Sequence, residues 1–199
     1  MTAQTVPPRV VVGITGASGA LYARRTIEAL AAHEVEVHLS VTTLGRRLLH
    51  DELELKTVDP DALSGGRGDR VVVYNDNDLG AAIASGTFRH QGMIVVPASG
   101  NTIGAIASGV TNTLVQRAAA VTLKERRPLV IAHRESPVSL IELRNLVALT
   151  EAGAVIAPLA PGFYFKPTTL EEVVDFMAAR LLDLVGVNHT IAPRWGEED

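Results

Sequence analysis

RVVVGITGASGA, residues 9–20, is the stretch that decides the fold of this chain. Its first half is an apolar, mostly β-branched run, which predicts a buried strand over residues 9–14. Its second half is a turn of small residues, and apolar side chains then recur at helical spacing, which predicts a helix over 20–32. Small residues let the backbone approach a ligand closely, and the first N–H groups of a helix point toward an anion. The stretch therefore suggests a phosphate-bearing ligand at the end of the first strand.

The composition fits one globular domain. The 199 residues are 47% hydrophobic, and 18 basic against 22 acidic residues give a net charge of −4. No basic stripe interleaved with aromatic residues occurs, so we expect no nucleic-acid partner. No apolar run of about 18 residues and no leader are recognised, so we expect a cytoplasmic protein without a membrane partner. Cysteine is absent, which excludes disulfides and cysteine metal sites.

Strands and helices alternate along the rest of the chain. This alternation predicts an α/β, Rossmann-like (flavodoxin-like) fold, in which a mostly parallel sheet is covered by helices on both faces. We expect a single domain over 9–188, with a flexible tail at 1–8 and a C-terminal tail at 189–199. Residues 56–70 are rich in Asp, Gly, Ser and Pro and indicate a surface loop. Further strands are expected over 35–41, 71–73, 93–97, 129–132 and 154–157, and helices over 44–52, 103–108, 112–125, 137–152 and 168–185.

Two of these helices have recognisable start signals. Ser136 before Pro137 is typical of a cap followed by proline at the first helical position, and Gly153 would end that helix. Thr168 and Glu171 have the spacing of a capping box, which predicts the start of the last helix.

A second small polar turn, ASGNT at 98–102, follows the strand expected over 93–97. Ligands of doubly wound sheets bind beyond the carboxyl ends of the strands. Because this turn and the turn at 15–19 both lie at such ends, we expect them to build one shared site.

The spacing of the glycines limits the choice of phosphate ligand. No nucleoside-triphosphate loop occurs, and Gly13, Gly16 and Gly19 are spaced by three, which does not fit the dinucleotide fingerprint. The Tyr-x-x-x-Lys pair of short-chain dehydrogenases is absent as well. A turn lined by Ser and Thr suits a monophosphate such as that of FMN. A tight strand–helix turn without any ligand also uses such glycines, and both interpretations stay open at this point.

Several later segments, read together with the turn at 13–20, resemble one family in order and spacing. LKERRPLV at 123–130, Arg134-Glu135 and PGFY at 161–164 resemble the flavin prenyltransferases (UbiX type). The segments ASG at 84–86, RAA at 117–119 and PRW at 193–195 are similar too. The resemblance covers nearly the whole chain, and its segments are specific only when taken jointly.

The resemblance implies a flavoprotein that transfers a dimethylallyl group from dimethylallyl phosphate to N5 and C6 of reduced FMN. The product, prenylated FMN, would serve a partner decarboxylase. The resemblance also implies that no metal is needed and that the active sites lie at subunit contacts of a dodecamer.

By resemblance, residues of both small turns hold FMN. Ser18 lies near N5 of the flavin and counts among the catalytic residues. Glu52 lies near the N5–C6 edge and accepts the C6 proton, although sequence alone does not separate it from Asp51 and Glu54. The full set expected to hold FMN is Gly16, Ala17, Ser18, Thr42, Ser99, Gly100, Asn101, Thr102 and Arg134.

The phosphate of the prenyl donor is expected to meet fixed cations, because a leaving phosphate carries a charge of about −1.5 to −2 near neutral pH. Arg117 and Lys124 are seven residues apart on one expected helix and so share a face. Arg180 neighbours the apolar face of the last helix, and we expect it to point toward the protein body. A snorkelling or paired structural arginine also fits this position. By resemblance, the phosphate is surrounded by Ser85, Arg117, Lys124, Arg134, Tyr164 and Arg180, some of them from neighbouring subunits.

Glu135 is the candidate acid that protonates the leaving phosphate, because like charge disfavours an ionised carboxyl group. Alternatives apply to these charged residues. Lys124 to Arg127 are also typical of a solvated helix end, where cations complement the helix dipole. Arg134 and Glu135 are also typical of an ion pair on the rim of a sheet.

The sequence departs from the family at Ala98, Thr111 and Leu79, where relatives often have Cys, Asp and Trp. Two other functions compete with prenyl transfer. A non-enzymatic FMN carrier does not need Glu52, Lys124 or the other expected site residues. A flavin-dependent decarboxylase of the peptidyl-cysteine type uses a Pro-x-Met-Asn substrate clamp, which is absent from this sequence.

Overall fold

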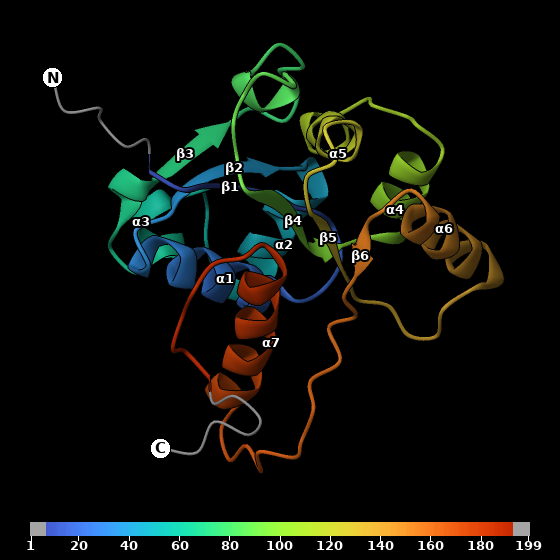
Figure 1. Ribbon diagram of the computed structural model, residues 1–199. Helices are drawn as coiled ribbons and strands as arrows, with labels where there is room; N and C mark the ends of the chain where they lie inside the picture. Colours follow the sequence, from blue (N-terminus) through green and yellow to red (C-terminus); the bar gives the residue numbers. More distant parts are fainter. Residues whose placement is uncertain (1–6, 193–199) are drawn as a thin grey trace, which may run out of the picture.

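The computed structural model describes residues 7–192, which build a parallel sheet with helices on both faces (Figure 1). The sheet order is β3-β2-β1-β4-β5-β6, and every strand pairing in the described residues is parallel. The expected Rossmann-like fold is confirmed. The strands are β1 (Arg9–Ile14), β2 (Glu36–Val41), β3 (Val71–Tyr74), β4 (Gly92–Ala98), β5 (Leu129–His133) and β6 (Val155–Ile156).

Seven α-helices and two short 3₁₀ helices, η1 (Gly68–Arg70) and η2 (Ala82–Ala84), occur in the described residues. No helix in this part of the chain combines the length and the apolar character that a membrane span requires. The α-helices are α1 (Ala20–Ala32), α2 (Thr43–Leu53), α3 (Pro60–Ser64), α4 (Gly100–Ala107), α5 (Leu114–Lys124), α6 (Leu140–Glu151) and α7 (Leu170–Leu184).

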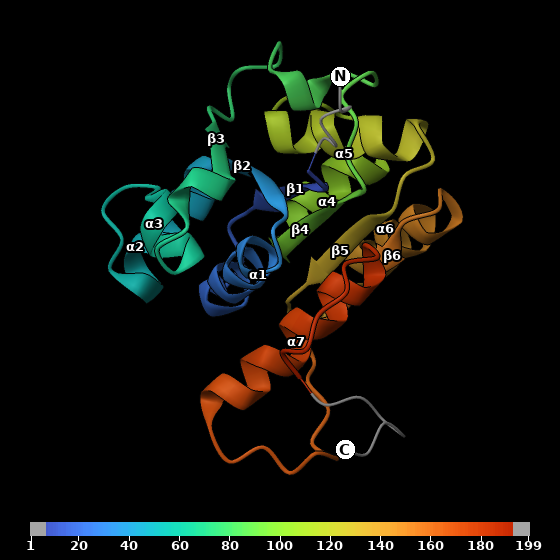
Figure 2. The same ribbon diagram turned by 60° about the vertical axis from the view of Figure 1, so that its left-hand side comes forward.

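The sheet separates two apolar cores. Consecutive side chains of a strand point to opposite faces, so Val10 and Val12 of β1 pack with α1 and α7, whereas Val11 packs with α4 and α5. Figure 2 shows α1 and α7 on one side of the sheet and α4, α5 and α6 on the other. The strands are therefore buried on both faces, which explains why they read as continuous apolar runs.

The strand order of the sheet reverses between β1 and β4. From β1 it proceeds outward through β2 to β3, and then returns to place β4 on the other side of β1. Gly13 pairs with Ser40 of β2 and with Val95 of β4, so the three carboxyl ends lie side by side. A crevice forms at such a switch point because the connections leave in opposite directions.

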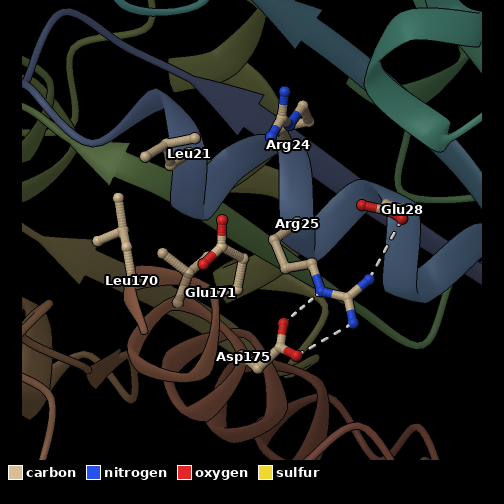
Figure 3. A pocket seen from close by; sticks show the side chains of 8 residues that line it. Leu21, Arg24, Arg25, Glu28, Leu170, Glu171 and Asp175 are labelled. Carbon is tan, nitrogen blue, oxygen red and sulfur yellow. Dashed lines mark hydrogen bonds and ion pairs between the residues drawn. The ribbon is translucent and has the colours of Figure 1, made fainter. Parts of the chain in front are cut away.

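Arg25 fastens α7 to α1. Its guanidinium donates to both oxygens of Asp175 on α7 and pairs with Glu28 at 3.3 Å, as Figure 3 shows. The hydrogen bond to Asp175 raises the pKa of Arg25. A pocket of about 300 Å³ lies beside this contact, and none of the residues predicted for the site lines it.

Residues 56–70 are not only a loop, so that expectation is wrong in part. Asp59 accepts hydrogen bonds from the N–H groups of Asp61 and Ala62 and thereby caps α3, with Pro60 at the first helical position. Leu63 of this helix is fully buried against the core. The start signal was present, but the surrounding polar residues obscured it.

Two expected helix starts are displaced along the sequence. Ser136 and Pro137 do not open α6, because Ser139 caps it in a capping box with Glu142. The capping box of α7 joins Thr169 and Glu172, one residue later than expected. Two overlapping Thr-x-x-Glu patterns occur there, and the later one forms the capping box.

The predicted domain boundaries stay a prediction. Residues 1–6 and 193–199 lie outside the described residues, including the matching segment PRW at 193–195. Within the described part, Pro8 accepts a backbone hydrogen bond from Glu36 at 2.9 Å. His189, in the expected C-terminal tail, is buried.

Gly45 is the position where α2 presses on the end of β1. A Cβ atom there would lie 2.5 Å from the backbone oxygen of Ile14. Alanine in a helix is normally more stable than glycine by about 0.5–1 kcal/mol, but this clash with backbone outweighs the gain. We predict that Gly45→Ala lowers the free energy of unfolding by about 1–3 kcal/mol, measured by denaturant titration.

Gly80→Ala is the matched control, because its added Cβ would meet only Asp78 Oδ1, at 3.4 Å. We expect its unfolding midpoint to stay close to that of the wild type. Equal midpoints for Gly45→Ala and the wild type would contradict the close approach of α2 to β1.

Candidate functional site

A cleft of about 440 Å³ opens at the switch point, beyond the carboxyl ends of β1, β2 and β4. Seven of its lining residues belong to the predicted site, six of them expected to hold FMN, and the seventh is Glu135. The lining residues are Gly16, Thr42, Thr43, Leu44, Asp76, Asn77, Ser99, Gly100, Asn101, Thr102, Thr113, Gln116 and Glu135.

Thr15 joins the two small turns. Its hydroxyl donates to the Pro97 carbonyl oxygen at 2.8 Å and accepts from the Ser99 N–H at 2.8 Å. Thr15 is fully buried, so neither group can turn to water instead. The turns after β1 and β4 are thus held in one arrangement, as their shared position at the strand ends predicted.

Two helices begin at the cleft with free N–H groups. The hydroxyl of Thr42 caps α2 by accepting from the Gly45 N–H, and the hydroxyl of Ser99 caps α4 by accepting from the Thr102 N–H. The remaining first-turn N–H groups have no hydrogen-bond partner among residues 7–192. They belong to Thr43, Leu44, Gly100 and Asn101, all of which line the cleft.

Asp76 accepts hydrogen bonds from the first N–H groups of a third helix at the cleft, α5. Its Oδ1 accepts from Val115 N–H and from the Ser40 hydroxyl, both at 3.0 Å, and its backbone oxygen accepts from Leu114 N–H at 2.7 Å. Asp76 is buried and lines the cleft. The predicted site did not include Asp76.

Glu52 of α2 occupies the start of α1. Its Oε2 accepts from the N–H groups of Gly19, at 3.0 Å, and Ala20, at 2.8 Å. An anion does lie at this helix start, but it is a side chain of the protein, so the expectation that these N–H groups receive a ligand phosphate is wrong. Through this contact, Glu52 binds the residue that directly follows Ser18 in the sequence. Sequence reasoning did not foresee this, because the partners are more than 30 residues apart.

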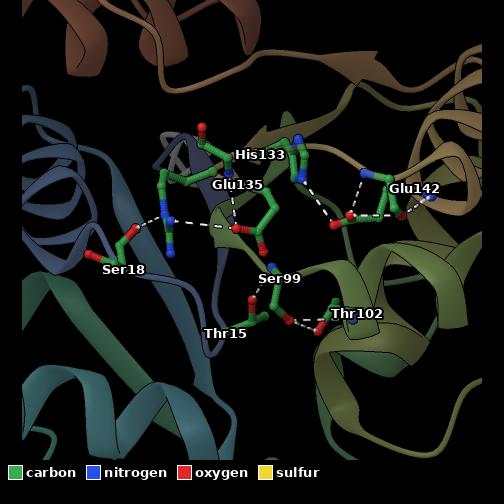
Figure 4. Close-up of polar contacts among 10 residues, drawn as sticks. Thr15, Ser18, Ser99, Thr102, His133, Glu135 and Glu142 are labelled. Carbon is green, nitrogen blue, oxygen red and sulfur yellow. Dashed lines mark hydrogen bonds and ion pairs between the residues drawn. The ribbon is translucent and has the colours of Figure 1, made fainter.

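Arg134 and Glu135 follow β5, and they lie at the turn after β1 and at the cleft, respectively. Arg134 Nε donates to the Ser18 backbone oxygen at 3.0 Å, and its Nη1 lies 3.8 Å from Glu135 Oε1. Glu135 accepts from the Ser136 N–H at 3.0 Å, and Figure 4 shows it above Ser99, between the two turns. Arg134 thus contacts the turn that carries Ser18 and Ala17, although none of these three lines the cleft.

Part of the predicted phosphate set lies on α5. Lys124 Nζ pairs with Glu125 at 2.8 Å, and this hydrogen bond lowers the pKa of Glu125. A Cβ on Gly86 would lie 3.2 Å from Lys124 Nζ, so the loop that carries Ser85 reaches the end of α5. Arg117 is exposed on the same helix.

Another part of the set lies at α7. The ring of Tyr164 packs against Phe176 of α7, with 5.7 Å between ring centroids. Arg180 is 54% exposed and pairs with Asp183 at 3.1 Å, so the expectation that Arg180 points toward the protein body is wrong. Its apolar neighbours in the sequence face the sheet, and Arg180 lies on the other side of the helix.

A single chain therefore does not bring the predicted phosphate ligands together. Arg134 lies beside the cleft, Arg117 and Lys124 lie on α5, and Tyr164 and Arg180 lie at α7. Figure 1 shows α5 and α7 on opposite sides of the sheet. The assignment of these residues to one phosphate stays a prediction. In the described residues, no group of three or more His, Asp or Glu side chains is arranged to hold a metal ion.

Known proteins match this sequence over nearly the whole chain. A family model described as Flavoprotein matches residues 2–187. A protein of Pseudomonas aeruginosa named flavin prenyltransferase UbiX is 40% identical in an alignment 200 positions long, which covers 96% of this chain and 96% of that one. This chain belongs to the flavin prenyltransferase family. The resemblance found in the sequence is confirmed.

Solved structures agree with the fold. The crystal structure of AnUbiX in complex with FMN and dimethylallyl pyrophosphate has a TM-score of 0.89 and 39% identity, over 98% of this chain and all of that one. A dodecameric FMN-dependent Ubix-like decarboxylase from Escherichia coli O157:H7 has a TM-score of 0.86 and 38% identity, over 94% of this chain and 98% of that one.

The hydroxyl of Thr15 can be removed with little change of shape. We predict that Thr15→Val lowers the free energy of unfolding by about 1–3 kcal/mol, because the buried Ser99 N–H loses its acceptor. Amide hydrogen exchange at Ser99 should accelerate at the same time. Thr26→Val is the control, since the buried Thr26 hydroxyl bonds only the Tyr22 carbonyl of its own helix. Unchanged exchange at Ser99 in Thr15→Val would contradict the joining role of Thr15.

Proposed function

We propose that this protein is a flavin prenyltransferase that joins a dimethylallyl group from dimethylallyl phosphate to N5 and C6 of reduced FMN. The observation that carries the proposal is the cleft at the switch point, because residues expected to hold FMN and the expected acid Glu135 line it together. The AnUbiX structure, which contains FMN and a dimethylallyl diphosphate, supports it. Prenylated FMN would pass to a partner decarboxylase, and we place the protein in the cytoplasm.

The helix starts indicate where the FMN phosphate binds. The first N–H groups of α1 are taken by Glu52, and those of α5 by Asp76. The starts of α2 and α4 remain open toward the cleft, and open helix starts attract anions. The phosphate of FMN would therefore lie between Thr43 and Gly100.

The reactive edge of the flavin would then lie toward the turn after β1. Reduced FMN supplies the nucleophilic N5 and C6 atoms of this reaction. Glu52 accepts a hydrogen bond from the N–H of Gly19, the residue after Ser18, and this contact supports the proposal that Glu52 accepts the proton from C6. Glu135, in the wall of the cleft, would give a proton to the leaving phosphate, as a general acid does. Arg134 holds the Ser18 backbone from the other side.

We propose that the protein acts as a homo-oligomer, with a dodecamer as the expected form. Helix α6 buries only Leu149 and exposes four large apolar side chains, Leu140, Ile141, Leu143 and Val147. Exposed apolar patches of this kind mark interaction surfaces. The dodecameric relative from Escherichia coli supports the assembly. Contacts between copies would also bring the separate α5 and α7 groups toward one phosphate.

The proposal is tested by anaerobic incubation of the protein with chemically reduced FMN and dimethylallyl phosphate. We expect the extracted flavin to gain the mass of one five-carbon prenyl unit. FMN incubated without protein is the control for spontaneous addition. Tightly bound FMN of unchanged mass would contradict prenyl transfer and favour the alternative of an FMN carrier.

Glu135→Gln tests the expected acid. Glutamine keeps an oxygen that accepts from the Ser136 N–H, but it cannot supply the proton. We predict that prenyl transfer slows by about a hundredfold or more, while the dissociation constant of FMN stays nearly unchanged in a fluorescence titration. Glu151→Gln, at the exposed end of α6, is the matched control. An equal loss of transfer rate and FMN affinity would refute the assigned role.

A further inference from the structure

Asp183, near the end of α7, is bonded to two side chains at once. Its Oδ2 accepts from Arg180 Nη1 at 3.1 Å, and its Oδ1 lies 3.1 Å from His189 Nε2. Arg180 is more than half exposed, whereas the side chain of His189 is only 1% exposed. Asp183 therefore connects an outward-facing guanidinium to a fixed point inside the protein.

The surroundings of His189 decide which of its nitrogens carries the proton. Its Nδ1 is buried and has no hydrogen-bond partner in the described residues. A proton on Nδ1 would leave a buried donor unsatisfied, which is more costly than a buried lone pair on a ring nitrogen. We therefore place the proton on Nε2, where it is donated to Asp183.

The chain after α7 turns back and brings His189 Nε2 next to Asp183. Gly186 has a φ of 73°, a left-handed conformation that other residues rarely adopt, and its N–H bonds the Asp183 carbonyl at 3.0 Å. The N–H of Val187 bonds Leu182, and the Val187 side chain is buried in the core. The return turn is thus fixed, and His189 is fixed with it.

An anchored carboxylate restricts the guanidinium that it accepts from. A solvent-exposed arginine normally samples many rotamers, and holding it in one arrangement costs conformational entropy. The bond to Asp183 meets that cost before any ligand binds. Beyond this bond, the guanidinium N–H groups of Arg180 have no partner among residues 7–192, so they stay available to a phosphate.

We propose that Asp183 and His189 are positioning residues for Arg180, and that they orient its guanidinium toward the phosphate of the prenyl donor. This inference rests on the proposed function, in which Arg180 contacts that phosphate. Neither Asp183 nor His189 touches the substrate in this arrangement. Both act through the geometry of Arg180.

Asp183→Asn separates positioning from simple charge. A carboxylate close to a phosphate site repels the phosphate, so removal of its charge alone would lower the KM for dimethylallyl phosphate. Loss of the orientation of Arg180 would instead raise this KM. We expect Asp183→Asn to raise this KM about threefold to tenfold, the range common for coupled contacts, with the FMN dissociation constant unchanged.

The measurement uses the full-length protein with reduced FMN and varied dimethylallyl phosphate, together with Arg180→Ala and the double variant. We expect the double variant to show the KM of Arg180→Ala with no further increase. Glu34→Gln, which removes the exposed partner of Arg70, is the control for loss of an ordinary surface ion pair. It should leave the KM unchanged.

His189 is tested by a pair of substitutions of similar size. His189→Gln keeps a side-chain N–H for Asp183 and should stay near the wild-type KM, whereas His189→Phe has no donor and should match Asp183→Asn. If His189→Phe does not fold, the Asp183 variants decide the question alone.

Three results would overturn the inference. A KM that stays equal or falls in Asp183→Asn shows that Asp183 does not orient Arg180. Additive effects in the double variant show that Asp183 acts by another route. An unchanged KM in Arg180→Ala removes the phosphate contact on which the inference rests, and it leaves the proposed function intact as long as the flavin still gains the prenyl mass.

Discussion

The buried hydroxyl of Thr15 joins the two turns on which the candidate site is built. β1 and β4 are neighbours in the sheet but are separated by almost 80 residues of chain. Parallel pairing aligns their ends, yet it does not fix the backbone beyond the last paired residues. Thr15 does so by bonding both Pro97 and Ser99. The two turns are held together because a single buried side chain satisfies one donor and one acceptor that water cannot reach.

Carboxylates decide which helix starts remain electropositive. Four helices begin near the switch point, and a sequence cannot show which of them faces a ligand. Glu52 neutralises the start of α1 and Asp76 that of α5, each across more than 30 residues of chain. Among residues 7–192, α2 and α4 are the helices that keep free N–H groups at the cleft. The protein thus directs an anion to one side of the site by filling the competing positions with its own acidic side chains.

Local patterns in the sequence predicted the fold well, because they act within a few residues. The stretch 9–20 folds as its alternation of apolar run, small turn and helical spacing indicates. Errors arose where two local signals overlapped, as in the capping box of α7, or where polar residues hid a short helix, as in α3. The roles of Glu52 and Asp76 depend on tertiary contacts, so no local pattern reveals them. The family resemblance supplied Glu52 but not its hydrogen bonds to α1.

The distribution of cations over one chain favours chemistry at a boundary between copies. Phosphate departure needs several positive groups around one anion, but α5 and α7 cover opposite faces of the sheet and cannot approach each other within a chain. A cation that must meet a ligand held by another copy gains from being oriented before the copies meet. Its orientation must then come from its own chain. The buried anchor of Asp183 beside Arg180 satisfies that requirement, whereas Lys124 needs only its neighbour Glu125 at the helix end.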